Sequence, residues 1–333
     1  MRVLQVGLGS MGKRRIRNLQ YLGYQDILGF DPREDRRQEA ATRYNISTVD
    51  NYQNIEWDDI THVVVSTPPD KHMQYAIDAV RYDKHVFIEA SVVDNDMDIL
   101  HQEAQKRDVI VAPSCTMRFD PIVIKTKEVL DNDQLGKVLF ANHHFGQYLP
   151  YWHPYENISD FYVSKRETGA AREIVPFDLV YLSWLLGHPK QLAALTSNTA
   201  TLGIDIDDIY SLLYKTDRGT QVHLTIDVVS KVSYRYTNIV TENGNIELDN
   251  VKGTLSIYYA DEKKWAHYTR QQFAQTLSTE EMYVTEMSSF LDAAAGKASY
   301  PYSLEDDHRI LQYLYAAETS AKSGHIHMAD SND

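Results

Sequence analysis

Cysteine is almost absent from this chain of 333 residues, in which Cys115 is the only one. One cysteine cannot form an internal disulfide or a cysteine-based metal cluster. Apolar runs long enough to cross a bilayer are also absent, and the first residues have the pattern of a strand with no signal peptide before it. We therefore expect a cytoplasmic protein that does not bind membranes.

Positive charge is scarce as well. The 33 Lys and Arg residues are outnumbered by 47 Asp and Glu residues, for a formal net charge of −14. This balance argues against the basic surface that a nucleic-acid partner requires. The hydrophobic fraction of 43% is that of a globular protein, and the length is enough for two domains with separate cores.

The first 31 residues have the pattern of a dinucleotide-binding βαβ unit. An apolar strand at 3–6 leads directly into Gly7-Leu8-Gly9-Ser10-Met11-Gly12, which has the form G-x-G-x-x-G. A helical pattern follows, and a second apolar strand at 27–30 ends at Asp31. The glycine pattern predicts a Rossmann domain only in a particular context, which is a strand, the glycine turn, a helix, a second strand and an acid in this order. All five are present here.

Each residue of the turn has a physical role in this prediction. Gly7 makes the tight turn after the strand, Gly9 lets a pyrophosphate approach the backbone, and Gly12 lets helix and strand pack closely. The helix N-terminus, at Ser10 and Met11, would offer its amide groups to the phosphates. The acid at the end of the second strand, roughly 20 residues on, would accept hydrogen bonds from the adenosine ribose.

The cofactor is predicted to be NAD, with NADP left open. Asp31 would repel the 2′-phosphate of NADP, and this favours NAD. However, Arg33, Arg36 and Arg37 follow at once, and an arginine at this place can accommodate that phosphate. The same arginines would also fit the solvated face of the next helix.

Strands and helices alternate up to about residue 115, as a doubly wound parallel sheet requires. Ligands of such sheets bind beyond the carboxyl ends of the strands. Apolar strands at 63–66 and 86–89 therefore bring candidate cofactor-binding residues to that edge. They are Thr67, Pro68, His72 and Glu89, although a plain loop proline and an exposed histidine are the alternatives for Pro68 and His72.

Beyond residue 118 the pattern changes to long β-type segments, several of which alternate apolar and polar residues. That alternation predicts a largely antiparallel sheet with one face left to solvent or a partner. Helices are predicted at 170–186 and near 280–295 and 304–323. The expected fold is α/β, with an N-terminal Rossmann domain built on a doubly wound parallel sheet at 1–118, a C-terminal α/β domain with an open, largely antiparallel sheet at 119–326, and a flexible tail at 327–333.

Four motifs occur together in this chain. They are the glycine turn, Ser66-Thr67-Pro68-Pro69 with His72, His85-Val86-Phe87-Ile88-Glu89, and Pro301-Tyr302-Ser303-Leu304-Glu305-Asp306. As a set they resemble the glucose–fructose oxidoreductase and inositol dehydrogenase (Gfo/Idh/MocA) family. The resemblance implies hydride transfer between a nicotinamide cofactor and a small sugar-like carbinol. It also implies pairing of subunits through the face of the C-terminal sheet, as a homodimer or homotetramer.

Two departures from the family pattern concern proton transfer. Where the family usually has Glu-Lys-Pro, this chain has Glu89-Ala90-Ser91, and alanine can neither polarise the reacting oxygen nor move its proton. Where the family usually has Asp-x-x-x-His on a helix, Glu173 and Phe177 occupy the two positions. The chain therefore lacks both of the usual proton-handling residues.

The segment 146–156 is rich in aromatic and hydrogen-bonding side chains, which suit a sugar ring with apolar faces and hydroxyl edges. His153 is the first candidate for proton transfer because its ordinary pKa lies near neutrality, and Lys165 and Tyr148 are the next. A loop histidine and aromatic packing at a subunit interface are the structural alternatives. The segment and the helix after it resemble a subgroup associated with surface-polysaccharide gene sets, and the candidate substrate-binding residues are Trp152, Arg172, Glu173 and Asp178.

No metal site is predicted. His143 and His144 are adjacent, so in a strand they would point to opposite faces and could not hold one ion together. Asp205, Asp207 and Asp208 are expected to form a solvated turn. Neither group has the spacing of a ligand set.

Two functions remain open at this stage. The first is an NAD(P)-dependent oxidoreductase acting on a sugar or sugar derivative, with nucleotide-linked and acidic sugars among the candidates, and with the cofactor exchanged or retained and recycled on the enzyme. The second is a non-catalytic dinucleotide-binding protein, a sensor or partner subunit that keeps the family fold. Ala90 and Phe177 motivate the second function, because they replace the usual catalytic side chains.

Overall fold

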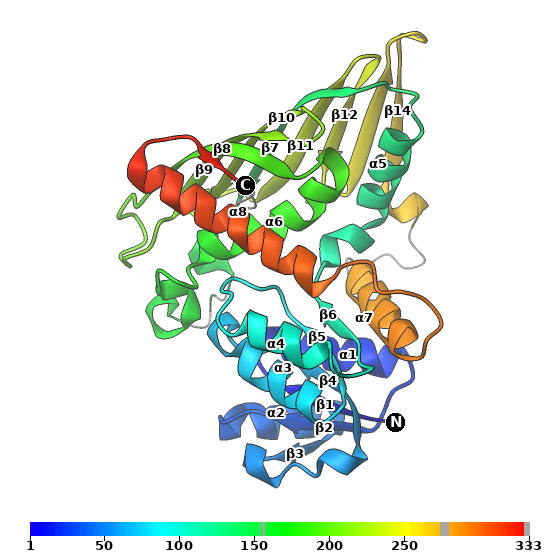
Figure 1. The fold of residues 1–333 in the computed structure, drawn as a ribbon, viewed down its shortest axis with the longest axis vertical. Coiled ribbons are helices and arrows are strands. Elements are labelled where there is room, and N and C mark those ends of the chain that lie inside the picture. The colour runs from blue at the N-terminus through cyan, green and yellow to red at the C-terminus, as the bar shows by residue number, and fades with distance from the viewer. Residues whose placement is uncertain (153, 155–156, 274–279, 330–333) are drawn as a thin grey trace. The chain divides into compact units, whose positions relative to one another are not determined.

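The computed structural model describes residues 1–152, 154, 157–273 and 280–329. The chain divides into two compact units, one formed by Met1–Thr116 with Ser278–His308 and the other by Met117–Leu277 with Arg309–Asp333. The two stretches that make up each unit are far apart in the sequence. Each unit has its own sheet and is described separately (Figure 1).

The first unit contains a parallel sheet of six strands in the order β3-β2-β1-β4-β5-β6. The order reverses beside β1, which gives a doubly wound sheet with its ligand-binding switch point between β1 and β4. This confirms the predicted Rossmann topology. The strands are β1 (Arg2–Val6), β2 (Ile27–Phe30), β3 (Ser47–Val49), β4 (Ile60–Val65), β5 (His85–Ile88) and β6 (Val111–Pro113).

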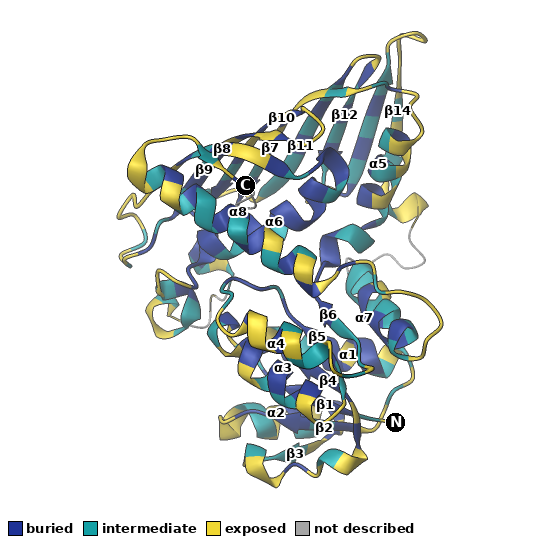
Figure 2. Ribbon diagram, viewed as in Figure 1, coloured by how far each residue is buried: buried dark blue, intermediate teal, exposed yellow. Residues whose placement is uncertain are grey.

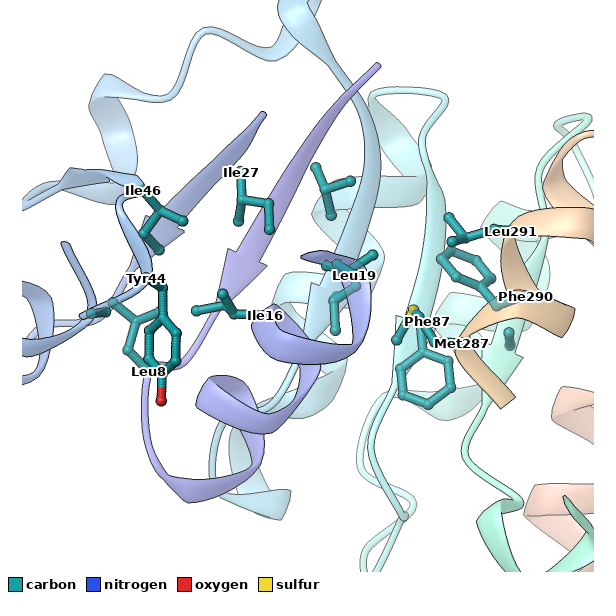
Figure 3. Packing of buried hydrophobic residues seen from close by; sticks show 14 residues of the cluster. Leu8, Ile16, Leu19, Ile27, Tyr44, Ile46, Phe87, Met287, Phe290 and Leu291 are labelled. Carbon is teal, nitrogen blue, oxygen red and sulfur yellow. The ribbon is translucent and has the colours of Figure 1, made fainter. Parts of the chain in front are cut away.

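Five α-helices belong to this unit: α1 (Ser10–Tyr21), α2 (Glu34–Tyr44), α3 (His72–Arg81), α4 (Met97–Ala104) and α7 (Glu280–Ala294). Residues of α1, α2 and α7 share one buried apolar cluster with residues of the sheet (Figure 3). Helix α3 packs over β4 and β5 and against α4. The right-handed crossovers from β1 to β2 and from β4 to β5 place α1 and α3 on opposite faces.

Helix α7 completes the core of the first unit although it comes late in the sequence. Its Met287 and Phe290 are fully buried, and the ring centroid of Phe290 lies 5.9 Å from that of Phe87 in β5. Large aromatic side chains contribute most to such a core. The continuous boundaries predicted from the sequence, 1–118 and 119–326, do not include this return of the chain.

The second unit contains a mixed sheet of nine strands in the order β14-β13-β12-β11-β7-β10-β9-β8-β15. Its pairs are antiparallel except for β7 and β10, which confirms the expected sheet. The strands are β7 (Val138–Gly146), β8 (Pro189–Ser197), β9 (Ile209–Thr216), β10 (Gln221–Asp227), β11 (Tyr234–Thr241), β12 (Gly244–Asp249), β13 (Thr254–Tyr259), β14 (Lys264–Thr269) and β15 (His327–Met328). His327 and Met328, assigned to a tail from the sequence, pair with β8.

Three helices, α5 (Pro121–Asp131), α6 (Ala170–Leu186) and α8 (Leu304–Ser323), cover one face of this sheet, and the other face is open (Figures 1 and 2). The alternation in strand β10 illustrates the difference between the faces: Val222, Leu224 and Ile226 are buried, whereas Gln221 and His223, which point to the other face, are exposed. Helix α6 ends at Gly187, whose φ of 98° belongs to the left-handed side that favours glycine. Short 3₁₀ helices complete the structure: Tyr52–Asn54, Trp57–Asp59, Pro69–Lys71, Thr116–Phe119, Leu149–Tyr151, Ile158–Asp160, Tyr162–Ser164 and Arg270–Gln272.

Truncating Phe290 tests the packing of α7 in the first unit. Phe290→Ala removes a fully buried ring and should lower the free energy of unfolding by about 3–5 kcal/mol. Ile99→Ala, at an exposed position of α4, should change it by only about 0.5 kcal/mol. Denaturant unfolding followed by circular dichroism measures both, and equal effects would contradict the packing described.

Candidate functional site

The turn between β1 and α1 is closed so tightly that two of its positions admit only glycine. Gly7 has a φ of 88°, and a Cβ there would lie 2.5 Å from the carbonyl oxygen of Ser66. A Cβ on Gly12 would lie 1.9 Å from the carbonyl oxygen of Gly7. Both approaches are far inside van der Waals contact, so the glycines are required by the backbone itself.

Gly9 differs, because a Cβ there would meet no backbone. Its nearest neighbour would be the Nη1 atom of Arg36, 3.4 Å away at the end of a flexible side chain. Gly9 is also the N-cap of α1 and gives that helix no side-chain cap, so Ser10 and Met11 begin the helix with uncapped amide groups. An absent side chain beside a helix N-terminus forms a cradle for an anion, and this is the fit that a pyrophosphate requires.

Asp31 is fixed at the end of β2 beside this turn. Its carboxylate accepts hydrogen bonds from the backbone amides of Leu8 (2.8 Å) and Arg33 (2.9 Å), and the residue is only 3% exposed. The Arg33 guanidinium pairs with Asp35 at 2.6 Å, and Arg37 donates to the carbonyl oxygens of Asp31 and Pro32. The carboxylate thus lies where the sequence predicted the ribose-binding acid, and these two arginines make contacts within their own segment.

His72 supports the loop after β4. It is almost completely buried and its Nε2 lies 2.9 Å from the carbonyl oxygen of Thr67, to which it donates. Burial lowers the pKa of His72, so the neutral ring is favoured. Thr67 is half-buried and Pro68 is exposed. The structure therefore gives His72 a backbone-positioning contact, while Thr67 and Pro68 border the switch point.

Glu89, the first residue after β5, belongs to a buried ion-pair network centred on Arg15. The Nε and Nη2 atoms of Arg15 donate to the Glu89 carboxylate at 2.6 and 3.1 Å, and Nη2 also donates to Glu286 of α7 at 2.8 Å. Burial alone would lower the pKa of Arg15, but the two carboxylates raise it above its ordinary value. Nothing in the sequence pointed to Arg15 or Glu286, because a charged residue in a helix is normally exposed.

Glu286 is held from three further directions. Its carboxylate accepts hydrogen bonds from the Ser114 hydroxyl (3.0 Å), the Cys115 backbone amide (2.6 Å) and the Thr116 hydroxyl (2.7 Å). Burial raises the pKa of Glu286, although Arg15 and these donors act in the opposite direction. Such donors are what an ionised carboxylate needs inside a protein.

The candidate substrate residues of α6 already have partners within the second unit. Arg172 is buried and donates to Glu318 at 2.6 Å and to the carbonyl oxygen of Glu167 at 2.6 Å. The Glu173 carboxylate accepts a hydrogen bond from the hydroxyl of Tyr162 at 3.2 Å. These contacts fix the first turns of the helix.

Asp178 is completely buried at the covered face of the sheet. It pairs with the Nε2 atom of His143 at 2.8 Å and with the Nε atom of Arg235 at 3.2 Å. The Arg235 guanidinium also lies 5.2 Å from the centre of the Phe177 ring, a cation–π distance. The position where the family usually has histidine is therefore occupied by a ring packed under an arginine.

The proton-transfer candidates differ in their surroundings. Tyr148 is half-buried, with the Lys231 ammonium 2.8 Å from its ring centre and the Tyr151 ring at 4.9 Å. Lys165 is exposed. His153 lies outside the described residues. Trp152 is half-buried, and its indole N–H is buried without an acceptor among the residues that the structure describes.

The two adjacent histidines of β7 point to opposite faces, as predicted. His143 is buried, whereas the side chain of His144 is 41% exposed on the open face, with Nε2 2.9 Å from Asp227. Within the described residues no three His, Cys, Asp or Glu side chains form a group that could hold a metal ion. The prediction of a solvated turn was wrong for Asp208. This residue is buried and accepts hydrogen bonds from the backbone amide and hydroxyl of Thr199.

The parallel sheet, the glycine cradle and the fixed acid define a dinucleotide-binding protein of the Rossmann class. Family models extend this class to both units: residues 1–114 match the oxidoreductase family with an NAD-binding Rossmann fold, and residues 123–247 match the GFO/IDH/MocA C-terminal domain. The chain belongs to the Gfo/Idh/MocA oxidoreductase family.

Several characterised proteins are similar to this chain. The myo-inositol 2-dehydrogenase of Thermotoga maritima is 30% identical over 142 residues, which are 41% of this chain and 42% of that protein. The inositol 2-dehydrogenase 2 of Saccharopolyspora erythraea is 26% identical over 78% of this chain and 76% of its own length. The matched segments span less than half of some relatives, such as the Thermotoga enzyme and the oxidoreductase P35 of Formosa agariphila, of which 35% is covered.

Solved structures share the whole fold. A levoglucosan dehydrogenase in complex with NADH and levoglucosan superposes with a TM-score of 0.88, covering 99% of this chain and 100% of that one at 17% identity. An oxidoreductase from Agrobacterium radiobacter, in complex with NAD⁺, L-tartaric acid and magnesium, gives 0.85 at 13% identity, covering 99% and 98% of the two chains. None of the helices in the described part of the chain has both the length and the apolar composition needed to span a bilayer.

Alanine at two positions of the turn should separate folding from cofactor binding. Gly12→Ala places a Cβ against the Gly7 carbonyl and should lower the free energy of unfolding by about 1–3 kcal/mol. Gly9→Ala meets only the end of Arg36 and should leave stability within about 0.5 kcal/mol while weakening NAD binding severalfold. Denaturation and calorimetric titration measure the two effects, and unaltered NAD affinity in Gly9→Ala would exclude this turn as the phosphate site.

Proposed function

We propose that this protein is an NAD-dependent oxidoreductase that acts on a hydroxyl-bearing carbon of a sugar or sugar derivative, with nucleotide-linked and acidic sugars among the candidates. The observation that carries the proposal is the cradle at Gly9 next to the fixed carboxylate of Asp31. Relatives named for inositol and the superposable levoglucosan dehydrogenase support a polyhydroxylated substrate. Cys115, the one cysteine of the sequence, is buried and forms no disulfide, which is compatible with work in the reducing cytoplasm.

The chain's residues would divide the work as follows. The turn from Gly7 to Gly12 binds the pyrophosphate through backbone amides, and Asp31 accepts hydrogen bonds from the adenosine ribose. NAD, when bound, supplies a hydride acceptor. The Trp152 ring offers an apolar surface for a sugar face and an N–H for a hydroxyl group. Arg172, Glu173 and Asp178 are the further candidates for binding the substrate, and their contacts hold α6 in place.

The hydroxyl proton needs a carrier, because Ala90 and Phe177 cannot bind one. His153 is the first candidate, followed by Lys165 and Tyr148. The same two replacements favour the alternative function, a non-catalytic dinucleotide-binding sensor or partner subunit. The two functions differ in one respect: both require NAD binding, but only the first requires turnover.

Turnover with a panel of sugars tests the proposed activity. We expect NAD reduction with at least one free, acidic or nucleotide-linked sugar, at a higher kcat/KM than with NADP. Asp31→Ala should weaken NAD binding and narrow the difference between the two cofactors, because the carboxylate no longer binds the ribose diol or repels the 2′-phosphate. Tight NAD binding with no turnover across the panel would leave the sensor function instead.

The pH dependence of turnover tests the proton carrier. His153→Ala should lower kcat by about 10²–10⁴-fold with unchanged NAD affinity and should remove a limb of the pH–rate profile. Lys165→Met and Tyr148→Phe should each have smaller effects. His325→Ala, an exposed histidine of the same unit, serves as the control, and a similar loss in that variant would refute the assignment.

The open face of the nine-stranded sheet is the surface on which we propose that a second copy packs. The strand register places Leu195, Leu213, Phe140 and Trp265 on this face, and each is 40–71% exposed. Apolar side chains gathered on one surface are characteristic of subunit contacts. Two or four copies joined through this face would form a homodimer or homotetramer.

Charge placed on this face should dissociate the oligomer. Leu213→Glu puts a carboxylate on this face, beside Ala193 and His223 in the strand register, and should shift the mass measured by light scattering to that of one chain, because burying an unpaired charge is costly. Tyr21→Glu, at an exposed position of α1 in the other unit, should leave the mass unchanged. A wild-type mass of one chain would end this part of the proposal.

A further inference from the structure

The buried network at the end of β5 holds two carboxylates and one cation. Arg15 pairs with both Glu89 and Glu286, and the Ser66 hydroxyl lies 3.3 Å from Glu89. Within the described part of the chain, Arg15 is the one cation paired with either acid. His72 also lies nearby, and burial lowers the pKa of its ring, which favours the neutral form. With both acids ionised, the cluster therefore has an uncompensated charge of about −1.

The uncompensated negative charge follows from the replacement at position 90, where this chain departs from the family's Glu-Lys-Pro pattern. A lysine directly after Glu89 would bring a second cation to this edge of the sheet, but the chain has Ala90 there, half-buried and uncharged. A buried charge without a counter-charge is unfavourable, and it interacts strongly with any charge brought close to it in a poorly hydrated site.

Glu89 lies at the edge of the sheet where its negative charge would act on a bound cofactor. It is the first residue after β5, in the half of the sheet beyond the switch point from β1 and β2. In a doubly wound sheet each half takes one mononucleotide of a dinucleotide. Because Asp31 fixes the adenosine half at β2, the nicotinamide half belongs to the side of β4 and β5.

We propose that the negative charge of Glu89, which Arg15 does not fully compensate, makes this site bind NAD⁺ more tightly than NADH. The nicotinamide ring of NAD⁺ is a cation and that of NADH is neutral, so the surplus negative charge stabilises the first and not the second. The two forms are otherwise nearly identical in their phosphates and adenosine. This inference rests on the proposed function, because it requires that NAD binds at the turn.

Binding constants for the two forms test the inference without any turnover. Titration calorimetry of the full chain should show that Glu89→Gln weakens NAD⁺ binding by about tenfold and leaves NADH binding within about twofold, the effect of one charge in a partly buried site. Ala90→Lys keeps the network and adds a cation. It should therefore also weaken NAD⁺ binding relative to NADH binding. Asp292→Asn removes an exposed negative charge of α7 and is the control that should change neither constant.

The outcomes separate the inference from the function on which it rests. If the ratio of the NAD⁺ and NADH constants is unchanged in both Glu89→Gln and Ala90→Lys, Glu89 does not set the preference and the inference is overturned. If the wild-type chain binds neither form, the proposed function fails instead. Ala90→Lys also keeps the test valid should Glu89→Gln fail to fold.

Discussion

The pairing of Arg15 with Glu89 and Glu286 is the interaction on which the first unit depends most. It joins α1, the end of β5 and α7, and through Glu286 it also holds the backbone after β6 at Cys115. Buried ion pairs add little net stability compared with apolar packing, but removing one partner leaves a charge stranded in the core. The network therefore acts mainly as a specific connection between segments far apart in the chain.

The same network connects structure to chemistry. Arg15 lies in α1, whose N-terminus is the proposed phosphate cradle, and Glu89 directly follows β5, on the side proposed for the nicotinamide half. One buried guanidinium thus links the two proposed halves of the cofactor site. Family members with a lysine at position 90 would carry one more positive charge here, so the replacement by alanine changes the electrostatics of the site as well as its proton transfer.

The two faces of the nine-stranded sheet in the second unit carry different kinds of side chain. On its covered face, Asp178 pairs with His143 and Arg235 under α6, whereas the open face exposes Leu195, Leu213, Phe140 and Trp265, the side chains through which we propose that subunits pair. Among the described residues, the buried indole N–H of Trp152 has no acceptor, and the aromatic segment around Tyr148 and Trp152 is where we propose that a substrate binds.

The sequence by itself determined the parts whose causes are local. The glycine turn follows from the positive φ of Gly7 and from Gly12, whose Cβ would meet the carbonyl oxygen of Gly7, and the acid at Asp31 is placed by the end of its own strand. Period-2 alternation likewise predicted the sheet of the second unit. The tertiary structure decided the rest, because the cause lies in residues far apart along the chain. It placed α7 in the core of the first unit and paired Arg15 with Glu286. In the second unit it buried Asp178 in an ion pair with Arg235 and buried Asp208 in contact with Thr199. Charged residues with such partners look like ordinary surface residues until the fold supplies the partner.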